Sequence, residues 1–152
     1  MGITYRIAGS QDGADREHRK ALHPADLRIE AWGPTREECL AEAVRGLVDS
    51  FAIVTDRPPH ARAERHMTAL TDEDLLLAVI DEVLRWLDAD GEIPLSVVVR
   101  PAPDGGIIMF LVLVRAADVE IIGAVPKAAS PHGLRCSPDL AGRWTCVVTI
   151  DM

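Results

Sequence analysis

Two segments of the chain repeat apolar residues at helical spacing, and each begins with the residues that start helices. Thr35 precedes an arginine and two glutamates, and an apolar stripe then continues to Phe51. Thr71 precedes three acidic residues, and a broad apolar face continues to Leu87, shortly before Gly91. Threonine caps a helix start, acidic residues favour the first turn, and glycine favours the end. The pattern therefore predicts two helices, from Thr35 to Phe51 and from Thr71 to Gly91.

Other segments alternate apolar and polar residues with a period of two, which is typical of strands with one buried face. An Asp-Gly turn between two of these segments favours a hairpin. Hairpin signals outnumber crossover units, so we expect an α+β fold in which two or three helices pack on a mainly antiparallel β-sheet. The strands are expected over residues 26–31, 61–68, 95–100, 107–115, 125–136 and 143–150.

The first 20 residues differ from the rest, because they are polar and show no periodicity. We predict an extended or mobile lead over residues 1–20 and one domain over residues 21–152, a length that suits a single core. Within the lead, Tyr5-Arg6-Ile7 is a candidate edge strand. Since the lead has no core pattern, its removal is expected to leave folding intact.

Composition and charge narrow the class of protein. The sequence has no apolar run as long as the ~18 residues that a membrane helix needs, and its start has no signal-peptide pattern, which favours a cytoplasmic protein. The three cysteines form no Cys-x-x-Cys pair, and Cys39 and Cys146 fall on apolar faces, as small buried side chains would. A formal net charge of -8 argues against direct binding of nucleic acid. If the protein acts near RNA, a partner is therefore expected to carry the RNA.

The sequence lacks the common catalytic motifs. It contains no phosphate-binding Gly-x-x-x-x-Gly-Lys loop, no Gly-x-Gly-x-x-Gly and no Gly-x-Ser-x-Gly. Catalysis without a partner is therefore hard to support.

Two aspartates bracket the patterned part of the chain and provide its strongest functional signal. Asp26 begins one alternating segment and Asp151 ends another, and both fall off the apolar face. If the two strands are antiparallel neighbours, the carboxylates converge. Two carboxylates ~4 Å apart repel by roughly 4 kcal/mol at an effective dielectric of 20, so such a pair normally shares a proton or holds a cation. The alternative is that each aspartate is a turn or capping residue, which is the commonest role of an aspartate at a strand end.

Several motifs resemble the archease family in order and spacing, from about His23 to the end of the chain. They are His23-Pro24-Ala25-Asp26, Trp32-Gly33-Pro34-Thr35 before the first helix, Val125-Pro126-Lys127-Ala128, His132-Gly133-Leu134 and the final strand with Asp151-Met152. Archeases carry His-Thr-Ala-Asp where this chain has Pro24, and they end in an aspartate followed by an aliphatic residue. The resemblance implies the same α+β architecture.

The resemblance also implies a site. By position, the family's cation would be held by Asp26, Asp151 and the main chain of Met152, whose terminal carboxylate could add a ligand. The family's cation is calcium, and Mg²⁺ or Mn²⁺ would suit the same oxygen donors. His23, Lys127 and His132 match family positions and are expected to support the site or contact a partner.

The function implied by the resemblance is that of a metal-binding protein that activates an RtcB-type RNA ligase. Such a ligase joins 3′-phosphate or 2′,3′-cyclic phosphate ends to 5′-hydroxyl ends in tRNA splicing or RNA repair. The activator promotes guanylylation of the ligase and multiple turnover, and is itself not an enzyme. Two alternatives remain: a metal-dependent hydrolase that uses Asp26 and Asp151, and a general chaperone-like interaction module.

Overall fold

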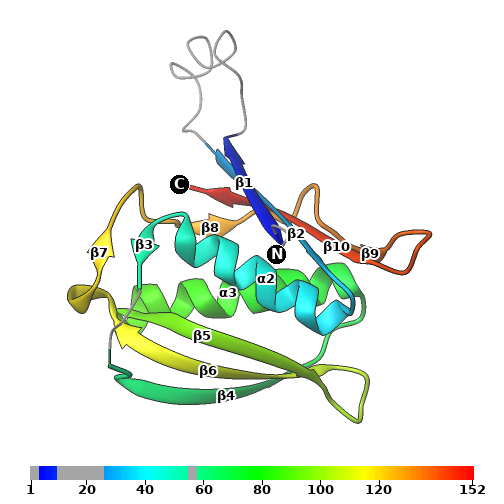
Figure 1. Cartoon of the computed structure of the whole chain (residues 1–152), viewed down its shortest axis with the longest axis horizontal. Helices are drawn as coiled ribbons and strands as arrows, with labels where there is room; N and C mark the ends of the chain where they lie inside the picture. The colour runs from blue at the N-terminus through cyan, green and yellow to red at the C-terminus, as the bar shows by residue number, and fades with distance from the viewer. Residues whose placement is uncertain (1–3, 10–25, 55–57) are drawn as a thin grey trace, which may run out of the picture.

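The computed structural model describes residues 4–9, 26–54 and 58–152. Two helices lie between two β-sheets, so that the described chain has three layers (Figure 1). In chain order, the elements are β1 Tyr5–Gly9, β2 Asp26–Gly33, α2 Arg36–Asp49, β3 Ala52–Ile53, β4 Ala61–Met67, α3 Asp72–Asp90, β5 Glu92–Pro101, β6 Ile107–Arg115, a 3₁₀ turn Ala116–Asp118, β7 Glu120–Ile121, β8 Ala128–Ala129, β9 Arg135–Pro138 and β10 Trp144–Asp151.

Both predicted helices are confirmed, together with their caps. The Thr35 side chain accepts a hydrogen bond from the Glu38 amide at 3.1 Å, and the Thr71 side chain accepts one from the Asp74 amide at 3.0 Å. Gly91 ends α3 with a φ of 63°, in the left-handed region that favours glycine. Local sequence signals therefore place these helix ends correctly.

All strand pairings among the described residues are antiparallel, which confirms the predicted mainly antiparallel arrangement. The first sheet has the order β1-β2-β10-β8, and β9 also pairs with β10. The second sheet has the order β4-β6-β5, and β3 pairs with β7 in a small separate ribbon. The apolar faces of the helices are broad, so burying them takes a sheet on each side of the helix layer. Buried residues of α2 contact both β2 in the first sheet and β5 in the second.

The strand expected over residues 125–136 is largely wrong. Only Ala128–Ala129 and the end of that segment, as part of β9, are extended strands. Proline has no amide hydrogen for a strand ladder, and Pro126 and Pro131 interrupt the segment. Gly133 has a φ of 72°, which turns the chain between the two short strands. The segment is therefore a loop with two brief strand pairings.

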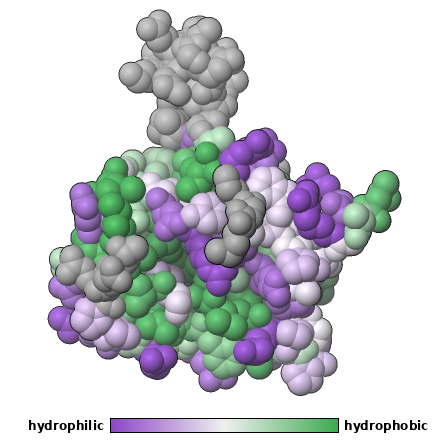
Figure 2. Space-filling view, in the orientation of Figure 1, coloured by the Kyte–Doolittle hydropathy of each residue, from purple (hydrophilic) through white to green (hydrophobic). Residues whose placement is uncertain are grey.

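The face shown in Figure 2 mixes hydrophilic and hydrophobic side chains, with hydrophobic residues gathered near its middle. None of the helices in the described ranges has the length and hydropathy needed to cross a membrane. The three cysteines are buried and not bridged, which confirms the prediction for Cys39 and Cys146. Contact with the Cys136 thiol, together with burial, strongly raises the pKa of Cys146 and keeps it protonated.

The edge strand expected at Tyr5-Arg6-Ile7 is confirmed as β1, which pairs with β2 from Tyr5↔Ala31 to Gly9↔Leu27. Tyr5 also packs against the core. A Cβ added at Gly46 of α2 would lie 3.1 Å from the Tyr5 ring, so glycine allows the ring to approach the helix closely. The lead thus supplies a strand whose Tyr5 side chain reaches the helix layer, whereas the effect of its removal on folding stays a prediction.

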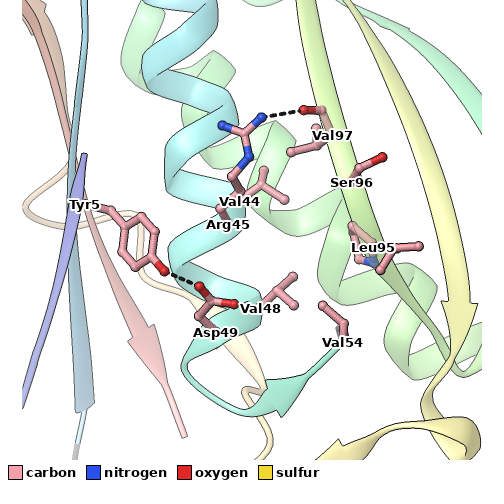
Figure 3. A pocket seen from close by; sticks show the side chains of 10 residues that line it. Tyr5, Val44, Arg45, Val48, Asp49, Val54, Leu95, Ser96 and Val97 are labelled. Atoms are coloured by element: carbon pink, nitrogen blue, oxygen red, sulfur yellow. Dashed lines mark hydrogen bonds between the residues drawn. The ribbon is translucent and has the colours of Figure 1, made fainter. Parts of the chain in front are cut away.

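Tyr5 donates a hydrogen bond to the Asp49 carboxylate, at one side of a pocket between α2 and β5 (Figure 3). The pocket has a volume of about 280 Å³ and an apolar lining that includes Val48 and Leu95. On its other side, Arg45 donates to the Val97 carbonyl at 2.8 Å. These two hydrogen bonds tie α2 to a strand of each main sheet.

The hydrogen bond to Asp49 should be visible in a titration. It raises the pKa of Tyr5 to about 12, with burial as the second cause. Tyr5 is the only tyrosine of the chain, so the change in ultraviolet absorbance that accompanies ionisation of a phenol reports on it alone. We expect an apparent pKa near 12 in the parent, and a value closer to 10 in Asp49→Asn.

The same shift predicts how stability depends on pH. The folded protein favours the protonated phenol, so this stabilisation is complete below the unfolded pKa of about 10 and disappears as the pH rises through the folded value near 12. Tyr5→Phe should remove the part of the pH dependence that belongs to this group. A parent protein whose Tyr5 titrates normally would contradict the hydrogen bond to Asp49.

Candidate metal centre

Asp26 and Asp151 are direct partners in the antiparallel pairing of β2 with β10. Ile29 and Ile150, which lie on the opposite face of the same strands, are fully buried. Side chains directly opposite each other in an antiparallel pair share one face, with Cβ atoms about 4.5–5.5 Å apart. The predicted convergence of the two aspartates is therefore confirmed by the strand register, whereas their role as metal ligands stays a prediction.

The electrostatic surroundings of the pair come from the same face of the sheet. Arg28 lies two residues from Asp26, but its guanidinium pairs with Glu30 at 3.1 Å, and Arg6 pairs with the same carboxylate at 2.6 Å. Within the described ranges, neither Asp26 nor Asp151 forms an ion pair. The pair therefore carries two like charges that an added cation would neutralise.

The donor chemistry of this pair fits a hard divalent cation. Calcium takes about six to eight oxygen ligands, and two carboxylates supply at most four of them. Among the described residues, no group of three or more His, Cys, Asp or Glu side chains could hold a metal ion. Asp26 and Asp151 would thus provide part of a coordination shell, and water or a partner would have to provide the rest.

Met152 follows Asp151 directly, and its side chain packs against the hydrophobic core. Successive side chains along a strand point to opposite faces, which explains why Met152 points inward while Asp151 is exposed. Only the main-chain oxygens of Met152 would then be available beside the acid pair. This arrangement agrees with the ligand type expected at this position.

Lys127 directly precedes β8, the strand that pairs with β10 at the end of the sheet where Asp151 lies. Asp151 is in register with Ala128 of β8, and the Lys127 amide donates to the Asp151 carbonyl at 2.8 Å. His132 is exposed in the following turn, where its amide donates to the Ser130 hydroxyl at 3.1 Å. The structure therefore brings the Lys127 main chain beside that of Asp151, but gives no contact between His132 and the acid pair. His23 lies outside the described residues.

A groove of about 650 Å³ lies between α3 and residues 125–128. Lys127 and Ala128 line it, but neither Asp26 nor Asp151 does. Asp81 and Asp88 line its helical side, and sequence analysis missed both because they look like ordinary polar positions of an amphipathic helix. The sequence offers one signal for them, a spacing of seven residues, which places both on the same face of a helix. The pocket of Figure 3 contains none of the predicted site residues.

The chain was compared with known proteins. The model of the archease protein family (MTH1598/TM1083) matches residues 19–152. The protein named "Probable protein archease" in Mycobacterium tuberculosis strains CDC 1551 / Oshkosh and ATCC 25618 / H37Rv is 42% identical over 147 residues, which cover 96% of this chain and 80% of the relative.

A solved structure has a similar fold. It is the solution structure of Methanobacterium thermoautotrophicum protein 1598, with a TM-score of 0.68 over 96% of this chain and 98% of the other. At 17% sequence identity this match supports the fold, while the family assignment rests on the sequence comparisons. The family model spans most of the chain, including Asp26, Lys127 and Asp151. The chain belongs to the archease family.

Proposed function

We propose that this protein binds a divalent cation through Asp26, Asp151 and the main chain of Met152, and thereby activates an RtcB-type RNA ligase. The observation that carries the proposal is the direct pairing of Asp26 with Asp151 at one end of the central strands. Membership of the archease family supports a non-catalytic role as a ligase activator. The RNA would be ligated by the partner during tRNA splicing or RNA repair.

The chain's own residues would do three things in this role. The fixed register of β2 and β10 holds two carboxylates side by side before a cation arrives, so that little ordering is needed on binding. The buried face of both strands fixes the position of the pair. The Lys127 backbone is bound to Asp151, and we propose that its exposed side chain contacts a phosphate or a partner carboxylate.

When bound, the cation would supply positive charge to oxygen atoms at this end of the sheet. Because the acids fill only part of the shell, ligand positions would remain for a group from the partner or for a phosphate. Calcium is our first choice, with Mg²⁺ and Mn²⁺ as alternatives that the same oxygen donors accept.

The direct test is a ligation assay with the cognate ligase, GTP and RNA fragments that carry the appropriate ends, with and without this protein. We expect faster guanylylation of the ligase and more than one turnover per ligase molecule. Hydrolysis of a phosphoester substrate by this protein alone would instead favour a metal-dependent hydrolase. Stimulation that survives loss of both acids would favour a chaperone-like module.

Calcium should stabilise the parent protein in the absence of the ligase. A ligand that binds only the folded state adds RT ln(1 + [L]/Kd), which is about 2.7 kcal/mol at a concentration of 100 Kd. We therefore expect millimolar calcium to raise the melting temperature of the parent. The double variant Asp26→Ala/Asp151→Ala should show no rise, and an equal rise in both proteins would place the cation elsewhere.

A further inference from the structure

The outer face of the first sheet carries a band of basic side chains. Both helices lie against the other face of this sheet (Figure 1). One row of register partners crosses β1, β2, β10 and β9 in the order Arg6, Glu30, Val147, Arg135. Arg28 lies on the same face as Glu30, because alternate residues of a strand point to the same side. Three arginines therefore surround one glutamate, and we call them the basic band.

A single carboxylate does not neutralise this band. Glu30 pairs with Arg6 at 2.6 Å and with Arg28 at 3.1 Å. Within the described ranges Arg135 forms no ion pair, and its Nε donates only a long hydrogen bond of 3.4 Å to the Ser137 hydroxyl. All three arginines are exposed. The basic band can therefore attract an anion although the whole chain has a formal net charge of -8.

The acid pair lies at one end of the basic band, on the same face of the sheet. Asp26, Arg28 and Glu30 alternate along β2, and Asp151 is the register partner of Asp26. Without a cation the two aspartates would repel an anion at this end. A divalent cation held there would instead extend the positive charge of the band to the end of the sheet. The face would then suit an anion that carries several charges along its length.

An aromatic pocket lies at the other end of the basic band. Trp32 follows Glu30 on the same face and lines a pocket of about 440 Å³ together with Pro34 and Arg143. The Arg143 guanidinium lies over the Trp32 ring, 5.8 Å from its centroid, and its Nε is 3.7 Å from the Asp139 carboxylate. Nucleobases stack on aromatic rings and on guanidinium planes. The pocket therefore combines the two kinds of surface on which a base stacks.

From this arrangement we infer that the outer face of the first sheet binds a single-stranded segment of the RNA substrate. Its phosphates would follow the basic band from the cation site, and one base would occupy the Trp32 pocket. Positive charge along the backbone combined with aromatic stacking is the usual way to bind single strands. An acidic protein segment would match the band alone, whereas phosphates and bases match the band and the pocket together. The inference rests on the proposed function, in which the ligase holds this RNA.

A matched pair of arginine variants tests the basic band. Arg135→Gln and Arg62→Gln each remove one charge from an exposed strand position that has no ion pair among the described residues, but Arg62 lies on β4 of the second sheet. Fluorescence anisotropy with a short labelled single-stranded RNA, in calcium and low salt, gives the Kd. Thermal unfolding checks that both variants fold.

We expect Arg135→Gln to raise the Kd for RNA about tenfold, because it removes a charge-assisted hydrogen bond to a phosphate. It should also flatten the plot of log Kd against log salt by about 0.7, the slope that one phosphate contact contributes on a single strand. Arg62→Gln should change the Kd less than about twofold. Equal affinities of the two variants, or a parent that binds no RNA, would overturn the inference.

Two further ligands test the Trp32 pocket and the class of partner. An abasic oligonucleotide of the same length keeps the phosphates and removes the bases. The parent should bind it at least about fivefold more weakly than the RNA, because base stacking is lost. Equal affinities would show that no base occupies the pocket. A polyglutamate peptide that binds as tightly as the RNA would overturn the inference in favour of an acidic protein segment.

The two proposals fail differently. If the parent stimulates ligase guanylylation but binds RNA no better than Arg135→Gln does, the RNA face is wrong and the proposed function stands. If the parent binds RNA in a way that requires Arg135 but stimulates no ligase, the RNA face is supported and the proposed function is wrong. A parent that neither binds RNA nor stimulates the ligase contradicts both.

Discussion

Asp26→Ala or Asp151→Ala is expected to reduce stimulation of ligase guanylylation by at least about a hundredfold. Changing a residue that only supports a metal ligand already costs about 10- to 100-fold in affinity or activity, and removal of a direct ligand should cost more. Each single change removes half of the acid pair that the strand register creates. The measurement is the initial rate of guanylylated ligase formation with a fixed excess of each variant.

The fold should survive these changes. Asp151 is exposed and Asp26 is only half-buried, and neither forms an ion pair in the described chain. Surface substitutions of this kind usually change the free energy of unfolding by no more than about 0.5 kcal/mol. Without metal, loss of one carboxylate also relieves the repulsion between the pair, so a slight gain in stability is expected. Urea unfolding in chelator measures this free energy.

Two comparisons separate a shared cation site from independent effects. If both acids hold one cation, the double variant should lose no more stimulation than either single variant, because coupled sites are not additive. Asp118→Ala removes another exposed carboxylate, from the 3₁₀ turn, and should stimulate like the parent. Full stimulation by Asp26→Ala, or an equal loss with Asp118→Ala, would contradict the assignment.

The elements that could be predicted are those whose signals are local. The caps at Thr35 and Thr71 and the left-handed Gly91 fix the helix ends within a few residues, and alternation places Asp26 and Asp151 off the core. The pairing of β2 with β10 joins residues far apart in sequence. The sequence predicts that the aspartates converge only if these strands are neighbours, because no local signal specifies which strands pair.

The elements that could not be predicted depend on contacts between distant segments. Tyr5 looked like part of a polar lead because its core contact needs Gly46 from another element. Pro126 fell within a predicted strand, but it lies in a loop, is buried and lines the groove. Asp81 and Asp88 are exposed helix positions, and they line a groove only because residues 125–128 pack beside α3. The groove is therefore a product of tertiary packing that no local pattern shows.

Deletion of residues 1–20 is expected to destabilise the protein by about 3 kcal/mol, because burial of a large side chain contributes about 1.5–3 kcal/mol and β1 half-buries both Tyr5 and Ile7. The deletion also removes the hydrogen bond from Tyr5 to Asp49. It leaves β2 as an open edge, whose unpaired backbone groups favour aggregation. Urea unfolding and light scattering would measure the two effects.

Point variants on the same strand separate packing from strand pairing. Tyr5→Ala should cost about 2 kcal/mol, since it removes the ring that packs against Gly46 and the core. Arg6→Ala is the matched control, because the Arg6 side chain is 62% exposed and does not pack on the core, and its ion pair with Glu30 is expected to contribute about 1 kcal/mol. If the deletion and Tyr5→Ala unfold at the same urea concentration as the parent, β1 contributes nothing to stability. In that case residues 21–152 would fold as an independent domain, as the sequence pattern alone suggested.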